Sequence, residues 1–181
     1  RKQLTETDKN DSPSSGEDWE SVKGGFRIDW SPSDTNAFTL QGDIFNIEQT
    51  TVEEHFLFED PWLVDKNQIT SKSGGDVLAK WTHKLSDTSR TSLQVYYDRS
   101  KTDYETSVST TNTLDLDFQH HIDLNGGHEI VWGVGYRYVV DDFSTSMEYR
   151  MDPDHYHHYL LSGFVQDTFP LFEDLTMTLG T

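Results

Sequence analysis

A short histidine-rich stretch carries the residue types best suited to metal chemistry. The segment DPDHYHHY, residues 152–159, places His155 and His157 close to Asp152. Imidazole nitrogens and carboxylate oxygens are ligands that divalent transition metals accept. In an extended chain His155 and His157 share one face and His158 takes the other, so at most two imidazoles converge without a bend. We predict a metal site at Asp152, His155 and His157, against the alternative of a polar stretch that merely suits a wet boundary.

An acidic and aromatic segment, TTVEEHFLFEDPWLVDKNQ at residues 50–68, is the second candidate. Long connections often carry ligand contacts, because a rigid scaffold positions them while their sequences can vary. We predict ligand contacts at Glu59, Asp60 and Trp62, together with Tyr156 of the histidine-rich stretch. The alternative is that residues 50–68 form an ordinary packed surface loop.

Catalytic patterns are missing from the sequence. The 32 Asp and Glu residues guarantee chance carboxylate pairs, and none lies in a distinctive context. There is no Gly-rich phosphate loop, nucleophile elbow or HExxH motif. His120 and His121 are adjacent and would point to opposite faces of a strand, so they cannot share one ion. We therefore predict that the chain is not an enzyme and binds no cofactor.

Charge and hydropathy restrict the class of protein. A net charge of -18 argues against a nucleic-acid partner, which would need a basic surface. Only 33% of the residues are hydrophobic, yet 13% are aromatic. Low apolar content with many aromatic rings indicates strands that are apolar on one face. A transmembrane barrel and a soluble β-sandwich both satisfy this condition. The absence of cysteine decides little, and no run of about 18 apolar residues predicts a membrane helix.

Alternation of apolar and polar residues recurs along the chain from Trp19 onward. In TLDLDFQHHID, Leu114, Leu116 and Phe118 fall on one face while acidic residues fall on the other. Acidic groups cannot face a dry core without partners, so one face must meet water. The residues assigned to the apolar, lipid-contacting face are Phe26, Ile28, Phe38, Leu40, Trp81, Val95, Leu114, Leu116, Phe118, Trp132 and Val134. Those assigned to the polar, inward face are Arg27, Gln41, Asp43, Lys80, Gln94, Asp115, Asp117 and Arg137.

The connections between these segments predict the arrangement of the strands. Short turns at residues 31–36, 86–89, 124–127 and 170–174 alternate with longer connections at about 48–73, 101–108 and 140–155. The strands span about 9–13 residues, close to the length that crosses an apolar membrane band at a tilt. We predict an all-β fold with antiparallel up-and-down strands of a transmembrane outer-membrane β-barrel, about eight strands forming part of a barrel.

The chain divides into a short polar segment at its start and a long region of alternating residues. Residues 1–18 are polar and aperiodic, so we expect a loop or a frayed end there. The barrel domain is predicted over residues 19–181. In the last hairpin the faces stay ambiguous, because Gln166 and Asp167 are adjacent polar residues.

Several segments together resemble the barrel of TonB-dependent outer-membrane receptors. They are DWESVKGGFRIDWSPSDTNAFTLQGDIFN, GGDVLAKWTHKLSD with TSLQVYYDRS, LDLDFQHHIDLNGGHEIVWGVGYRY and LSGFVQDTFPLFEDLTMTLGT, which cover about residues 18–181 in order. No single motif is diagnostic, and the order and spacing carry the resemblance. The chain departs from the family pattern because no plug domain or TonB-contacting box precedes residue 1. It also ends at Gly180-Thr181 without a terminal aromatic strand, where such receptors have about 22 strands.

The resemblance implies part of a receptor in the Gram-negative outer membrane that imports a scarce nutrient such as an iron-siderophore complex. The implied partners are membrane lipid and lipopolysaccharide, the receptor's own plug domain, the TonB complex and the small-molecule nutrient. The sequence leaves two alternatives open. One is a complete small eight-stranded outer-membrane barrel, and the other is a soluble secreted β-sandwich that binds carbohydrate or protein.

Overall fold

Eight strands follow one another along the chain in the computed structural model, which describes residues 18–56, 58–104, 106–144 and 151–181. The predicted polar segment 1–18 lies outside these ranges except for Asp18, which begins the first strand. The strands are β1 (Asp18–Ser33), β2 (Asn36–Phe56), β3 (Leu63–Ser86), β4 (Ser89–Tyr104), β5 (Ser107–Leu124), β6 (His128–Ser144), β7 (His155–Phe172) and β8 (Leu175–Gly180). Among the described residues no helix has the length and hydrophobicity needed to cross a membrane.

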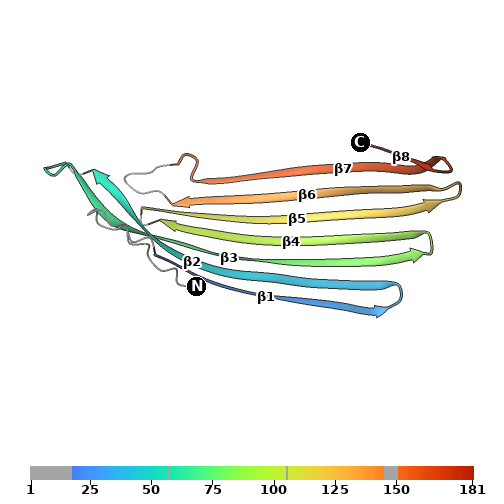
Figure 1. Ribbon diagram of the computed structural model, residues 1–181, viewed down its shortest axis with the longest axis horizontal. Helices are drawn as coiled ribbons and strands as arrows, with labels where there is room; N and C mark the ends of the chain where they lie inside the picture. Colours follow the sequence, from blue (N-terminus) through green and yellow to red (C-terminus); the bar gives the residue numbers. More distant parts are fainter. Residues whose placement is uncertain (1–17, 57, 105, 145–150) are drawn as a thin grey trace.

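Each strand pairs with its neighbours in the sequence. The strands form one antiparallel sheet in the order β1-β2-β3-β4-β5-β6-β7-β8 (Figure 1). The predicted all-β, antiparallel up-and-down arrangement is therefore confirmed. Consecutive hairpins are the simplest way to satisfy backbone hydrogen bonds, because each turn delivers the next strand directly beside the last.

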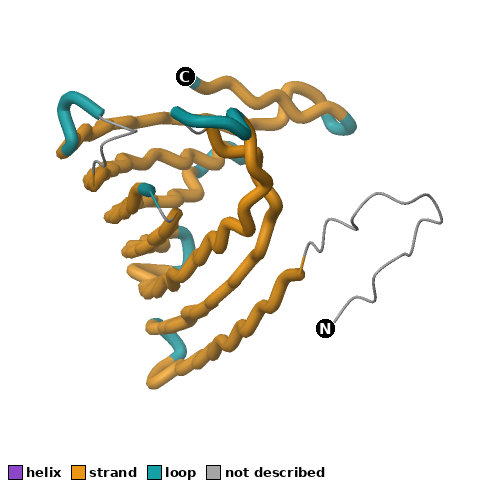
Figure 2. Tube along the Cα trace, turned by 90° about the vertical axis from the view of Figure 1, so that its left-hand side faces the viewer, coloured by secondary structure: helices purple, strands orange, loops and turns teal. Residues whose placement is uncertain are grey.

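The sheet is curved but open, as the view along the strands shows (Figure 2). In the described part of the chain β1 pairs with β2 and β8 pairs with β7, and the two outer strands do not pair with each other. A closed eight-stranded barrel would pair its first strand with its last, so the described strands do not form the closed barrel of that alternative. A single sheet also lacks the facing sheet that a β-sandwich requires.

One end of the sheet consists of tight turns. Strands β1 and β2 are joined after Ser33, β3 and β4 after Ser86, and β5 and β6 after Leu124. The short turn predicted at residues 124–127 is confirmed, and Gly126 and Gly127 have φ values of 95° and 83°. Positive φ at a turn matches the right-handed twist of the flanking strands, and glycine adopts it without a steric penalty.

Replacing Gly126 with alanine should destabilise the chain by about 1–2 kcal/mol, because a Cβ disfavours the left-handed backbone. The added methyl group has open space, with its nearest neighbour 3.8 Å away at the His128 ring, so the cost is conformational. The measurement is the midpoint of urea unfolding. Gly24→Ala is the matched control, because nothing lies within 4 Å of its added methyl group and its φ is not positive. Equal losses in the two variants would contradict the role given to the turn.

The opposite end of the sheet differs from the prediction. Residues 48–73, expected to be a long connection, are mostly paired strand, with Thr51 opposite Gln68 and Phe56 opposite Leu63. The expected connection at 101–108 is also wrong, because β4 ends at Tyr104 and β5 starts at Ser107. These segments were predicted as loops because their residues are polar, but backbone pairing between strands does not require apolar side chains. Strands β1 to β7 consequently run 16–24 residues rather than the expected 9–13.

The register of the strand pairs shows which residues lie on each face of the sheet. Antiparallel partners share a face, and an unbroken row joins Ile28, Leu40, Ala79, Val95, Leu116, Tyr136 and Leu161. The neighbouring residues on the same strands form the opposite row of Arg27, Gln41, Leu78, Tyr96, Asp115, Arg137 and Leu160. The predicted division of residues between an apolar and a polar face is confirmed. The ambiguous hairpin resolves as well: Asp167 shares the apolar face with Ile130 and Leu179, whereas Gln166 lies on the polar face.

Candidate functional site

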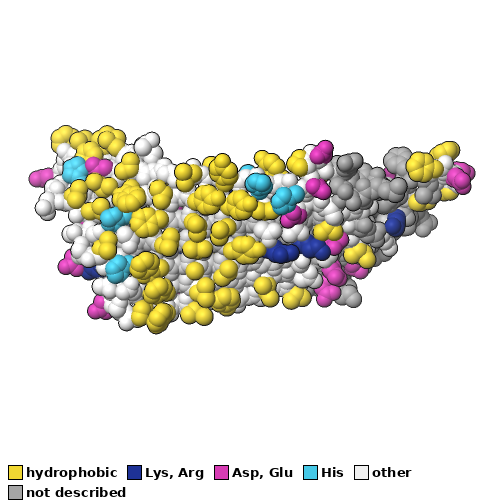
Figure 3. Space-filling model, turned by 180° about the vertical axis from the view of Figure 1, so that it is seen from behind, with side chains coloured by type: hydrophobic (Ala, Val, Ile, Leu, Met, Phe, Trp, Pro, Cys, Tyr) yellow, Lys and Arg dark blue, Asp and Glu magenta, His cyan; other side chains and the backbone are white. Residues whose placement is uncertain are grey.

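The apolar face is uncovered along its whole width. Figure 3 shows hydrophobic side chains gathered over the strands on this side of the sheet. Leu161 is 75% exposed and Ile44 is 71% exposed, and Val139 is the single buried hydrophobic residue among those described. A soluble monomer rarely exposes a contiguous apolar area of this extent. This face therefore needs an apolar environment or an apolar partner.

Aromatic rings form a belt on the apolar face near the tight turns. Trp30, Phe38, Trp81 and His83 stack across three strands, with ring centroids 5.3, 6.3 and 5.5 Å apart. Trp132 contacts Phe118 and His120 further along the same level. The rings combine a large apolar surface with polar edges, and the Trp81 indole N–H donates to the Asn36 Oδ1 at 3.1 Å. Such side chains favour the boundary between an apolar layer and water.

Tyrosines form a second level towards the other end of the sheet. Tyr97, Tyr138 and Tyr159 lie in one cross-strand row with Leu114. The Tyr97 hydroxyl donates to the Asn112 Oδ1 at 2.9 Å. Trp132 and Tyr138 on β6 are separated by roughly 20 Å of strand at about 3.3 Å per residue. The apolar face is thus bordered by amphipathic rings on both sides.

Hydrogen-bonded charged side chains line the opposite face. Arg27 donates to both carboxylate oxygens of Asp29, at 2.8 and 3.0 Å, and to Gln41 at 2.8 Å. Arg137 Nε donates to Asp115 Oδ2 at 2.6 Å. These groups are exposed, so each pair adds little stability by itself. Their arrangement makes this face compatible with water and incompatible with lipid.

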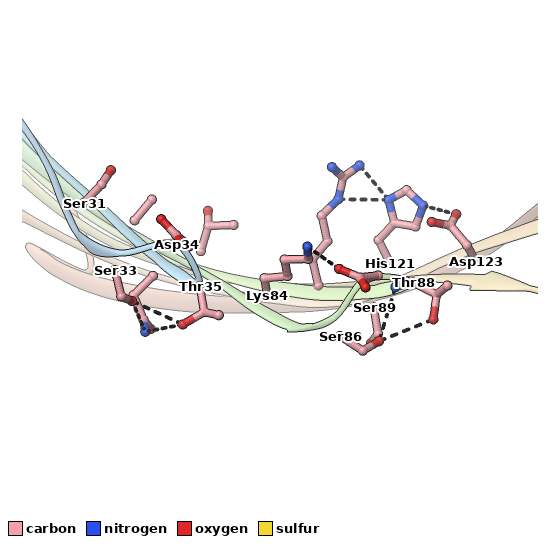
Figure 4. Close-up of a pocket in the computed structure, with 15 residues that line it drawn as sticks. Ser31, Ser33, Asp34, Thr35, Lys84, Ser86, Thr88, Ser89, His121 and Asp123 are labelled. Carbon is pink, nitrogen blue, oxygen red and sulfur yellow. Dashed lines mark hydrogen bonds and ion pairs between the residues drawn. The ribbon is translucent and has the colours of Figure 1, made fainter.

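A shallow hollow lies on the polar face above the tight turns (Figure 4). It is lined by turn residues of β1–β2 and β3–β4 and by Arg90, His121 and Asp123, and it has a volume of about 480 Å³. In the turn, Lys84 Nζ lies 2.6 Å from Asp87 Oδ1. The Lys84 ammonium lowers the pKa of the Asp87 carboxyl by a hydrogen bond and by its charge.

The edge of this hollow holds three convergent donors of metal-ligand type. His121 Nε2 is 2.9 Å from Asp123 Oδ1 and 3.1 Å from Glu129 Oε1. Within the described ranges this is the group of three that could surround an ion. The other ring nitrogen of His121, Nδ1, faces Arg90. Arg90 Nε lies 3.1 Å from Nδ1, and Arg90 Nη2 lies 2.7 Å from it.

Arginine only donates hydrogen bonds, so His121 Nδ1 must accept and the ring proton must lie on Nε2. That proton points at Asp123 and Glu129 and occupies the position that a metal would take. Metal-bound imidazoles normally donate their other N–H to an acceptor, and Arg90 offers no acceptor. The geometry therefore makes His121 a hydrogen-bonded bridge between a guanidinium and two carboxylates.

The His121 ring should show its proton on Nε2 in imidazole ¹⁵N NMR spectra, and added Zn²⁺ should leave its resonances unchanged. Arg90→Leu is the comparison, because removing the guanidinium frees Nδ1 and should let the other tautomer appear. Coordination of Zn²⁺ by His121 in the unmodified chain would show that the tautomer assignment is wrong.

The metal site predicted at Asp152, His155 and His157 is only partly assembled. The rings of His155 and His157 lie 6.1 Å apart on one face, and His155 Nδ1 is 2.5 Å from Asp142 Oδ1. Asp152 precedes β7 and does not join them in a group of three convergent donors. Cross-strand pairing of His157 with Val140 places both histidines on the apolar side of the sheet. Metal binding there stays a prediction.

The predicted ligand contacts divide between two places. Glu59, Asp60 and Trp62 lie at the tip between β2 and β3, exposed to solvent, and Trp62 is 63% exposed. In Figure 1 this tip projects beyond the ends of the other strands. Tyr156 lies on β7 opposite Asp141, on the polar face, and its ring is near that of His158 at 5.7 Å. The structure does not bring Tyr156 together with the tip, and ligand contact at these residues stays a prediction.

Sequence reasoning missed the cluster of Arg90, His121, Asp123 and Glu129. His121 and Asp123 are separated by one residue and were recognisable as neighbours on one face. Arg90 and Glu129 reach them only through the register of β4 with β5 and of β5 with β6. The short turns at 87–88 and 125–127 were the available indication that these residues meet.

The fold and the two faces define a class: an all-β chain whose single antiparallel sheet is apolar on one side and polar on the other. Comparisons with protein-family models, with curated proteins and with solved structures found no match to this chain.

Proposed function

We propose that the chain forms part of the wall of a β-barrel in the outer membrane of a Gram-negative cell. Its apolar face would contact lipid, and its polar face would line the barrel interior. The observation that carries this proposal is the uncovered apolar band, continuous across β1 to β7 and bordered by rings at two levels. Lipid tails solvate such a band, whereas water does not.

The height of the band supports a membrane as the apolar medium. On β6 the apolar-face residues from Ile130 to Tyr138 cover roughly 26 Å of strand at about 3.3 Å per residue. A tilt of about 40° reduces this to roughly 20 Å, close to the ~25 Å apolar band of outer-membrane barrels. Rings at two levels suit a bilayer, because a bilayer has two boundaries with water.

Within this proposal the barrel belongs to a TonB-dependent receptor that imports a scarce nutrient such as an iron-siderophore complex. The resemblance of successive strand segments supports this assignment, and so does the exposed tip between β2 and β3, which carries two acidic and two aromatic side chains beyond the wall. Lipopolysaccharide, a plug domain and the TonB complex are the proposed partners. The chain acts as scaffold and recognition surface and catalyses no reaction.

Membrane contact is tested by reconstituting the chain in phosphatidylcholine vesicles that contain brominated lipid. Trp30, Trp81 and Trp132 should be quenched more strongly by bromine near the headgroup than by bromine at the end of the acyl chain. A variant with Trp30→Phe, Trp81→Phe and Trp132→Phe should lose most of that difference, because the remaining Trp19 and Trp62 lie away from the apolar face. Folding to a dispersed monomer in plain buffer, without lipid or detergent, would contradict the proposal.

Nutrient import is tested in cells that produce the protein, by uptake of radioactive iron from a ferric siderophore. Glu59→Gln with Asp60→Asn and Trp62→Ala should reduce uptake while the amount of protein in the membrane stays unchanged. Glu173→Gln with Asp174→Asn removes two charges from the β7–β8 turn at the other end and serves as the control. Equal uptake in all three strains would contradict a role of the tip in import.

A further inference from the structure

The apolar face carries a small basic patch at its border, and this patch is the starting point of the inference. Strand alternation places Arg99 and Lys101 on the apolar face, directly beyond Tyr97. Every other described Lys or Arg in the strands falls on the polar side. Figure 3 shows basic side chains at the edge of the hydrophobic area, away from the turns. In a chain with a net charge of -18, two cations on the apolar face need a reason.

Two histidines extend the patch across three strand spacings. One cross-strand row joins Arg99, Asn112, Val140 and His157, and the next joins Lys101, Thr110, Asp142 and His155. Adjacent strands lie about 4.8 Å apart, so the basic groups of β4 and β7 are roughly 14 Å apart across the sheet.

The order of side chains along the strand matches the layers of a lipid. On the apolar face of β4 the sequence runs from Leu93 and Val95 through Tyr97 to Arg99 and Lys101. Hydrocarbon contact, an amphipathic ring and a cation follow one another over roughly 26 Å of strand. Strand β7 repeats the order with Leu161, Tyr159, His157 and His155.

The local pairing leaves part of the patch available to a ligand. Lys101 Nζ is 3.1 Å from Asp103 Oδ2, and His155 is bound to Asp142. Arg99 is exposed and lies opposite Gly75, which has no side chain to cover it. A guanidinium with five donors in a planar fork is suited to bind a phosphate by two parallel hydrogen bonds.

We propose that Arg99, Lys101, His155 and His157 bind the anionic phosphate headgroup of a membrane lipid in the leaflet nearer the β2–β3 tip. This rests on the proposed membrane location of the apolar face and names the lipid chemistry that this end of the face recognises. The phosphate lies at the level of the basic groups, while the acyl chains cover Val95, Leu116 and Leu161 below it.

The experiment uses the chain inserted in phosphatidylcholine vesicles that contain lipid A, whose phosphate groups lack a neutralising choline. After mild detergent extraction, lipid A retained per chain is counted by native mass spectrometry. An Arg99→Gln, Lys101→Gln double variant should retain about tenfold less lipid A, because each cation near the headgroups contributes to binding. The matched control is Lys72→Gln with Lys80→Gln, which removes the same charge from the polar face and should retain as much as the unmodified chain.

Four outcomes would overturn the inference. Equal retention by the Arg99/Lys101 variant and the unmodified chain would show that the patch does not bind the headgroup. Displacement of lipid A by inorganic phosphate at equal concentration would assign the patch to the free anion. Failure of the unmodified chain to insert in phosphatidylcholine alone would overturn the membrane proposal and the patch with it, whereas insertion without preference for lipid A would overturn the patch alone.

Discussion

Replacing Leu116 with arginine should destabilise the chain in lipid vesicles by about 2–4 kcal/mol, the cost of a charge on the lipid face near the midplane of the bilayer. Leu116 lies in the middle of the apolar face, between Val95 and Tyr136 in the cross-strand row. An arginine there would have to reach a distant headgroup or bring water into the apolar layer. The measurement is the free energy of folding into vesicles, from reversible urea titrations.

The control is the same substitution one residue further along. Asp117→Arg changes the polar face, next to Gln94, where water and other charged groups are available. We expect a loss well below that of Leu116→Arg, limited to the hydrogen bond that Asp117 accepts from Gln119 at 3.0 Å. Similar losses for the two variants would show that the faces have been assigned to the wrong media.

Replacing Gly133 with alanine should destabilise the sheet by about 1–3 kcal/mol, the usual cost of forcing extra volume into a packed position. A methyl group at Gly133 would lie 2.7 Å from the carbonyl oxygen of Phe118 and 2.6 Å from a ring carbon of Phe164. The Phe164 ring could rotate away, but the Phe118 carbonyl belongs to the β5 backbone. Relief therefore requires β5 and β6 to separate locally, which weakens their ladder. Urea unfolding in the same vesicles measures the loss.

Gly163→Ala provides the matched control on the adjacent strand. Its added methyl group would meet its nearest atoms at 3.5 and 3.8 Å, which are ordinary contact distances. We expect little change or a small gain in stability, because alanine reduces the freedom of the unfolded chain. A loss equal to that of Gly133→Ala would mean that any side chain at a glycine of this sheet is harmful, and that close approach to β5 is not the cause.

The faces of the strands could be predicted from the sequence because alternation is a local property. Leu114, Leu116 and Phe118 identify their face without knowledge of any partner strand. The tight turns were predictable for the same reason, since Asn125 and Gly126 favour a hairpin whatever lies around them. These two local features together define the order of the strands and which side chains share a surface.

The extent of the strands could not be predicted in the same way. Beyond the apolar band, polar residues occupy neighbouring positions on β2 and β3, so Thr50, Thr51 and Gln68 show no alternation in the sequence. Their pairing depends on backbone hydrogen bonds, which composition does not reveal. The cluster around His121 was hidden for a related reason, because Arg90 and Glu129 join it only through register. The width of the basic patch likewise requires the relative positions of β4 and β7.

The extended pairing of β2 with β3 has a consequence for recognition at the tip. From Ile44, at the border of the apolar band, to Phe56 the paired strand covers roughly 40 Å at about 3.3 Å per residue. With the apolar band placed in lipid as proposed, headgroup charges would be screened in physiological salt over about 8 Å, much less than this length of paired strand. Under that proposed placement, Phe58, Glu59 and Trp62 should meet a solute beyond the reach of the headgroup charges, and their affinity for it should not change with the lipid composition of the membrane.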